Sequence, residues 1–130
     1  MACTYRISEQ ERMIHIKIAE QMTVDELRRI IIAVISDDSY LPTHRIIMDA
    51  MQTQIIPRSG DVLQIARLFK KHEDVFCPKT ALIAKGGLHR DMMELILVLI
   101  RANTNIQIEL FGNTEAAVMW LDEPQPSESA

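Results

Sequence analysis

The chain has 130 residues, 48% of them hydrophobic, and a formal net charge of −4 at pH 7. That length suits one domain with a core that needs no disulfides, and the mild acidity argues against nucleic-acid binding. The two cysteines, Cys3 and Cys77, lack metal-ligand spacing and favour a reducing, cytoplasmic compartment. The longest apolar run is too short for a bilayer, so we expect no membrane span and no secretion signal.

The first two predicted elements are strands joined as a hairpin. Residues 3–8 and 13–18 both alternate between apolar and polar side chains, and a polar turn separates them. In the second run the isoleucines face one way, whereas His15 and Lys17 face the other. The chain therefore starts with an antiparallel strand pair that has one apolar face.

A capped helix and a buried strand come next. Thr23 and Glu26 fit the capping box, in which each side chain bonds to the other residue's backbone N–H. Apolar residues at helical spacing follow, and the polar run 36–39 ends the helix. Residues 46–48 are then consecutively apolar, which is typical of a strand covered on both faces.

Ser59 is predicted to begin the second helix, and two interpretations of it stay open. As an N-cap it stabilises the helix by about 1 kcal/mol and needs no further role. As a phosphorylation site it would act as a switch, because a helix N-terminus stabilises a phosphate. The exposed side of this helix is basic from Arg67 to His72, which suits either a solvated face or the docking of an acidic partner.

A short apolar strand over 80–84 leads through two glycines into a third helix over about 88–101. Glycines before a helix let backbone N–H groups face an anion, although a tight strand-to-helix turn explains the same pattern. Parallel strands would place this turn beside the start of the second helix, at the sheet edge where ligands bind. The candidate anion- or ligand-binding residues at this edge are Arg58, Gly60, Lys85, Gly86, Gly87, His89 and Arg90.

The third helix is apolar on nearly every side and is therefore predicted to be buried on more than one side. We expect it to form either a subunit interface or the wall of an apolar ligand pocket. The candidate interface residues are Met93, Leu97 and Val98. A strand over 106–111 and a helix from 112 to 121 complete the domain, and the polar stretch 122–130 is predicted to be a disordered tail.

The elements follow the order ββαβαβαβα, which predicts a single α/β domain built on a five-stranded, mostly parallel mixed sheet. If the strand order follows the chain, right-handed crossovers gather the helices mainly on one face. Strands two and five carry polar side chains on their other face, namely His15, Lys17, Gln107 and Glu109. Because parallel sheets are normally covered on both sides, we expect solvent or a partner on that face.

Three stretches of the sequence resemble the STAS domain family of anti-sigma-factor antagonists, and more closely its STAS-like bacterial relatives. The first is the hairpin with the capped helix start, from Tyr5 to Leu27. The second is Arg-Ile-Ile-Met-Asp-Ala before the Ser59-Gly60 helix start, and the third runs from Ile108 to Leu121. The resemblance covers residues 4–121 by pattern, and residues 1–121 are taken as the domain.

The resemblance implies a small α/β domain without a cofactor. Antagonist members carry a phosphorylatable serine at the start of the second helix, usually within Asp-Ser-x-Gly. The matching positions here read Pro57-Arg58-Ser59-Gly60, so the Ser-Gly pair is present and the preceding acid is replaced. The resemblance therefore marks Ser59 as the candidate phosphorylation site.

These observations favour a non-enzymatic regulatory or protein-interaction domain that forms a homodimer. The alternative is a carrier or sensor of a small apolar or lipid-like ligand, by fold-level analogy with the CRAL-TRIO lipid-binding domains. A third hypothesis is an enzyme that acts on a phosphorylated substrate at the turn over residues 85–90. No catalytic constellation is recognised, and the four histidines are scattered over different elements, so no metal site is expected.

Overall fold

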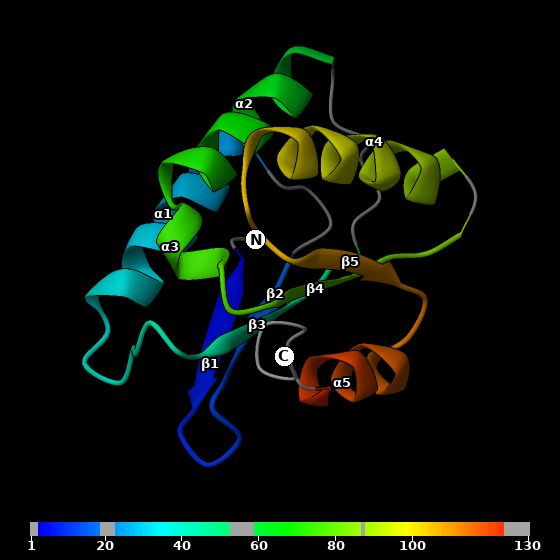
Figure 1. Ribbon diagram of the computed structural model, residues 1–130. Helices are drawn as coiled ribbons and strands as arrows, with labels where there is room; N and C mark the ends of the chain where they lie inside the picture. Colours follow the sequence, from blue (N-terminus) through cyan, green and yellow to red (C-terminus); the bar gives the residue numbers. More distant parts are fainter. Residues whose placement is uncertain (1–2, 19–22, 53–58, 87, 124–130) are drawn as a thin grey trace.

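The computed structural model describes residues 3–18, 23–52, 59–86 and 88–123, and for residues 59, 60, 88 and 89 it describes the backbone alone (Figure 1). Within these ranges the chain forms five strands and five helices. The strands are β1 (Thr4–Ser8), β2 (Met13–Lys17), β3 (Arg45–Asp49), β4 (Thr80–Ile83) and β5 (Ile108–Phe111). The helices are α1 (Val24–Ser36), α2 (Ser59–Lys71), α3 (Glu73–Phe76), α4 (Leu88–Asn103) and α5 (Thr114–Asp122).

The five strands form one sheet in the order β1-β2-β3-β4-β5. β1 and β2 pair antiparallel, and all other neighbours pair parallel. The register aligns one row of residues across the whole sheet: Arg6, His15, Ile47, Ala81 and Glu109. The predicted α/β fold with a five-stranded mixed sheet is confirmed.

The main core lies between the sheet and α1, α2 and α4, which share one face of it (Figure 1). It is built from the apolar stripes of these helices and from the alternate strand residues that face them. The one-turn helix α3 lies outside the predicted element order, because four residues are too few to show a helical period. Its position is fixed by Phe76, which is fully buried with its ring 4.3 Å from that of Phe69.

The opposite face of the sheet carries α5, which contacts β3, β4 and β5 (Figure 1). A second, smaller apolar cluster lies beneath it and includes Ile47 and Ile83. The end of α5 is held by Lys79, whose buried ammonium donates to Trp120 O at 2.8 Å and to Glu123 O at 2.7 Å. Cations suit this position because the last carbonyls of a helix carry partial negative charge.

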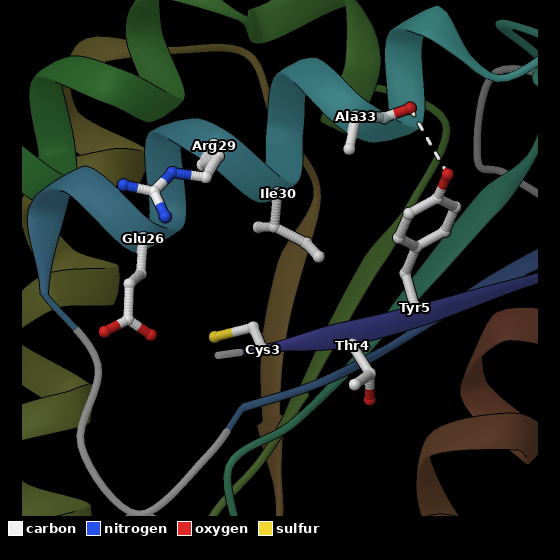
Figure 2. Close-up of a pocket in the computed structure, with 7 residues that line it drawn as sticks. All are labelled: Cys3, Thr4, Tyr5, Glu26, Arg29, Ile30 and Ala33. Carbon is white, nitrogen blue, oxygen red and sulfur yellow. Dashed lines mark hydrogen bonds between the residues drawn. The ribbon is translucent and has the colours of Figure 1, made fainter. Parts of the chain in front are cut away.

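The start of α1 confirms half of the predicted capping box. Thr23 Oγ1 accepts a hydrogen bond from Glu26 N–H at 3.1 Å. The reciprocal bond from Glu26 to Thr23 N–H is not formed among the described residues, and Glu26 Oε2 is buried without a hydrogen-bond partner there. The side chain of Glu26 is therefore turned toward β1 instead of closing the cap, as Figure 2 shows.

Candidate functional site

The two edges of the sheet differ in how their backbone groups are used. At the β5 edge, hydrogen bonds from Thr80 N–H to Gln107 O and from Ala84 N–H to Phe111 O place the odd-numbered carbonyls toward β4. The Ile108 carbonyl therefore points outward. It accepts from Arg101 Nε at 3.1 Å and from Nη2 at 2.7 Å. A helix side chain thus occupies one outward carbonyl of this edge, which another strand would otherwise use.

The β1 edge has its outward backbone groups at Tyr5 and Ile7. Hydrogen bonds from Ile18 N–H to Asp49 O and from Arg45 N–H to Arg12 O show that β2 directs its even-numbered residues to β3 and its odd-numbered residues to β1. The β1 residues paired with those odd-numbered residues are Thr4, Arg6 and Ser8. Among the described residues, no hydrogen bond reaches the outward backbone of the intervening Tyr5 and Ile7.

A pocket of about 410 Å³ lies beside this edge, between β1 and α1 (Figure 2). The strand and the helix run alongside one another in the same direction, so that Cys3 lies near Glu26 and Tyr5 near Ala33 (Figure 2). The pocket walls are largely apolar, with one acidic and one basic side chain from α1. The residues that line it are Cys3, Thr4, Tyr5, Glu26, Arg29, Ile30 and Ala33.

Tyr5 closes one end of the pocket at the end of α1, where its hydroxyl lies 3.4 Å from Ala33 O (Figure 2). Its hydroxyl donates to Asp37 Oδ2 at 2.8 Å, and Asp37 Oδ1 accepts from Ser39 N–H at 2.9 Å. The Ser39 N–H, with the Tyr5 hydroxyl, lowers the pKa of Asp37. The hydrogen bond from the Tyr5 hydroxyl to Asp37, with burial and the Asp37 charge, raises the pKa of Tyr5. At neutral pH the pair is therefore a phenol that donates to a carboxylate.

No described helix covers β1 and β2 on the face opposite the main core, because α5 lies over the β3–β5 side (Figure 1). A groove of about 280 Å³ lies there, with Thr114 at the start of α5 as one wall. The polar residues that line it are Thr4, Arg6, His15, Lys17, Asp49 and Thr114. The prediction that this face is partly uncovered agrees with the exposure of Arg6 and Lys17.

The charges in this groove are only loosely paired. Glu11 Oε1 in the hairpin turn lies 3.9 Å from Arg6 Nη1 and 3.4 Å from His15 Nε2. Both Arg6 and Glu11 are more than half exposed, so their attraction is weak in water. Lys17 makes no ion pair with the described part of the chain. Asp49 lies one strand further in and accepts from Met51 N–H at 2.9 Å.

The predicted anion-binding edge is described in part. Lys85 and Gly86 are exposed after β4, and Arg90 Nη1 lies 3.9 Å from the position that a Cβ atom on Gly112 would take. Arg90 Nε is also 4.0 Å from Glu94 Oε1. The approach of Arg90 to Gly112 joins the start of α4 to the residue that follows β5, whereas the predicted neighbour of the turn is the start of α2. Arg58 and Gly87 lie outside the described residues. Ser59, Gly60 and His89 are placed in their helices by the backbone alone, so both the cap and the anion site stay predictions.

The predicted interface on α4 divides between the core and the surface. Met93 and Leu97 are buried in the main core, so these two residues do not form an exposed patch on this chain. Val98 is 55% exposed and is joined by Leu95, which is 48% exposed. The reason is that α4 packs against both α2 and β5, and a helical wheel alone does not assign its apolar sides to these neighbours.

The space beneath α4 is also too small for a ligand. A cavity there, lined by apolar residues of the main core, has a volume of about 30 Å³. Ligand pockets are typically about 300–1,000 Å³, and 30 Å³ is roughly the volume of one water molecule. At this place, among the described residues, α4 fills the core and leaves no space for a lipid-like molecule.

Sequence reasoning did not find the residues that form the pocket beside β1. Ile30 and Ala33 were indistinguishable from ordinary helix residues, because the pocket depends on the distance between α1 and β1. A signal was available at Tyr5, a large aromatic residue on the core face of an edge strand whose hydroxyl needs a partner. The role of Arg101 at the β5 edge was not predicted either.

The described residues contain no group of three or more histidine, cysteine or acidic side chains that could hold a metal ion. No helix in the described ranges has both the length and the apolar character that a membrane crossing requires.

Burial, with the nearby Glu73 and Asp74 charges, raises the pKa of the Cys77 thiol, which therefore stays protonated at neutral pH. Comparison with protein-family models, with curated proteins and with solved structures finds no match for this chain.

Proposed function

We propose that this protein is a non-enzymatic protein-interaction domain of STAS-like fold, and that its partner binds on the β1 side of the sheet. By the β1 side we mean the outer edge of β1 together with the open groove on β1 and β2. The observation that carries the proposal is the incomplete cover of a mostly parallel sheet. The part that α5 leaves open lies over the antiparallel pair β1 and β2, and polar and charged side chains line it.

The chemistry of the β1 side suits a protein partner. Interfaces of non-obligate complexes combine an apolar centre with a polar rim and are enriched in tyrosine and arginine. Tyr5 and Ile30 supply apolar surface in the pocket, while Arg6 and Lys17 supply charge on the other face. The carrier hypothesis has less support, because the apolar cavity beneath α4 holds about 30 Å³.

A charge-reversal experiment tests this proposal. The bait is the full chain with Arg6→Glu and Lys17→Glu together, and the matched control is Arg67→Glu with Lys71→Glu on the exposed side of α2, which changes the net charge equally. We expect native mass spectrometry of complexes from host lysate to show the same partner with wild type and control, and a loss of that partner with the β1-side variant. Equal recovery by all three would remove the β1 side as the binding site.

The regulatory part of the proposal rests on Ser59 and on the STAS resemblance. A phosphate at the start of α2 would add negative charge at a helix N-terminus, which the helix dipole stabilises. Ser59→Asp imitates that charge, whereas Ser59→Ala removes the hydroxyl and should lower the unfolding free energy by about 1 kcal/mol. If wild-type and Ser59→Asp baits recover the same proteins equally, Ser59 is only a cap.

Self-association is also proposed, through the exposed Leu95 and Val98 on α4. Light scattering at tens of micromolar protein, roughly the usual assay concentration, should give a dimer mass. Val98→Asp should reduce it to the monomer mass because a charge in an apolar contact is costly. A monomer mass for the wild-type chain would remove this part of the proposal.

A further inference from the structure

We propose that the partner presents an extended segment that pairs antiparallel with β1 as a sixth strand, with apolar residues facing the pocket and acidic residues facing Arg6. This inference rests on the proposed function, because it specifies how the partner would bind on the β1 side. It is argued from three independent features of that side, namely its backbone, its pocket and its charge.

The backbone of β1 supplies two donors and two acceptors in a row. The register directs the N–H and C=O groups of Tyr5 and Ile7 away from β2, and no described residue bonds to them. Addition of a strand to an exposed sheet edge uses such groups, and the main-chain hydrogen bonds give the affinity. In an antiparallel pair, the incoming residues opposite Tyr5 and Ile7 exchange both backbone hydrogen bonds with them.

The pocket determines the incoming residue opposite Tyr5, because Tyr5 lines the pocket and Ile7 does not. Ile7 lies on the same face and favours an apolar residue opposite it by cross-strand pairing. Directly opposed residues in a strand pair point to the same face, so residues opposite Tyr5 and Ile7 point toward α1. There the pocket of about 410 Å³ offers the Tyr5 ring, Ile30 and Ala33 (Figure 2). A β-branched or other apolar side chain fits these walls and buries its surface next to them.

The charge of the opposite face determines the residues between them. The incoming residue opposite Arg6 points into the open groove, where Arg6 and the neighbouring Lys17 carry positive charge at the edge. Two acids lie nearby: Glu11 is 3.9 Å from Arg6 in an exposed, weak pair, and Asp49 is one strand further in. Opposite charges that face one another across strands are favourable, and like charges are unfavourable. Glutamate or aspartate therefore suits this position. The segment that the edge fits is extended and alternates apolar and acidic residues.

A second copy of the chain is a poorer occupant of this edge. In a two-fold antiparallel pair that uses the whole of β1, Thr4 lies opposite Ser8, and Arg6 lies opposite the same residue of the other copy. Two arginines directly opposite each other destabilise the pair. Charged residues on edge strands commonly prevent self-pairing in this way. The same arginine that discourages a second copy favours an acidic segment.

The test uses the full chain and a capped peptide of alternating glutamate and valine, long enough to span the five residues of β1. In the proposed pair the valine N–H groups bond to β1, and the glutamate N–H groups face solvent. We therefore use two further peptides, one N-methylated at every valine and one at every glutamate. A fourth peptide contains the same residues in a blocked order, with all glutamates first.

Amide NMR spectra report where each peptide binds. We expect the unmethylated and the glutamate-methylated peptides to shift the Tyr5 and Ile7 amides and to protect them from hydrogen exchange. The valine-methylated and blocked-order peptides should leave them unchanged. Equal effects of the two methylated peptides, shifts that map away from β1, or no shift with any peptide would overturn the proposal. Shifts of the β1 amides on raising the protein concentration without peptide would overturn it in favour of a second copy.

A second experiment exchanges the charges of Arg6 and of the peptide. Arg6→Glu should weaken binding of the glutamate–valine peptide by about tenfold, because it turns a favourable cross-strand pair into an unfavourable one. A lysine–valine peptide should bind Arg6→Glu better than wild type. Arg67→Glu on α2 should leave both affinities unchanged. The wild-type chain could fail to bind the peptide at β1 while recovery of its partner from lysate still depends on Arg6 and Lys17. That result would overturn this inference and leave the proposed function standing.

Discussion

The β5 side and the β1 side of this sheet differ in how their edge and face are covered. On the β5 side, Arg101 occupies the outward Ile108 carbonyl, and α5 covers the face that α4 does not. On the β1 side, the outward backbone of Tyr5 and Ile7 meets no described residue, and the face is an open groove. The same fold thus places an arginine on one outward carbonyl of β5, whereas within the described residues nothing bonds to the outward backbone of Tyr5 and Ile7 on β1. The outward N–H and C=O of Leu110 on β5 also have no described bond, so the two edges differ at the Ile108 carbonyl. Protected edges resist aggregation, so an edge left open is a candidate for recognition.

The largest expected effect concerns the cover of the β5 side by α4. Leu97→Ala should lower the free energy of unfolding by about 2–5 kcal/mol, because Leu97 is fully buried between α4 and the sheet. Its neighbour is the matched control at protein concentrations low enough for a monomer, since Val98→Ala on the exposed side should there change stability by less than about 0.5 kcal/mol. Urea unfolding of both variants checks this. Similar costs at the two positions would mean that the exposed side of α4 is covered in solution.

That pair of residues also shows where prediction from sequence ends. The order of elements and the mixed sheet followed from periodicity, because alternation and helical spacing are local properties of the chain. Which side of α4 faces the core was not local, since it depends on α2 and β5 packing against it. The pocket beside β1 depends in the same way on the separation of α1 from β1. Local patterns therefore predicted the elements but not the surfaces between them.

The next effect concerns α5, which separates the covered half of the second face from the open half. Lys79→Met keeps much of the side-chain volume but removes the ammonium that holds Trp120 O and Glu123 O. Hydrogen bonds from a charged donor contribute about 1.5–3 kcal/mol, and the unfolding free energy should fall by about that amount. Because Trp120 is the one tryptophan in the chain, its fluorescence also reports on this end of α5. Unchanged stability would show that packing alone holds α5.

Substitution of Arg101 tests the difference between the two edges directly. Arg101→Leu keeps the apolar contact of the side chain and frees the Ile108 carbonyl, so the β5 edge becomes as open as the β1 edge. We expect a loss of about 1 kcal/mol in unfolding free energy, because the guanidinium is partly exposed. Hydrogen exchange at the outward Leu110 amide should become faster. If exchange there is unchanged, Arg101 does not protect the edge.

The smallest expected effect is a pH dependence on the β1 side, where Tyr5 and Asp37 join β1 to α1. The pKa of Asp37 is lowered by the Ser39 N–H and the Tyr5 hydroxyl, so its contribution to stability is present above the ordinary aspartate pKa, about 3.9. That contribution is lost as the pH falls through the lowered pKa. Asp37→Asn keeps an acceptor but not the charge, so wild type should be the more stable protein at neutral pH.

The difference between wild type and Asp37→Asn should then shrink as the pH falls below about 4. Tyr5 has the opposite sign, because its hydrogen bond to Asp37 raises the pKa of the phenol. Its contribution is complete below the ordinary tyrosine pKa of about 10 and is lost as the pH rises toward the raised value. Tyr5→Phe should therefore flatten the alkaline limb of the stability profile and leave the β5 side unaffected. Urea unfolding across the pH range, read beside hydrogen exchange at Leu110, separates a local effect on β1 from a general loss of stability.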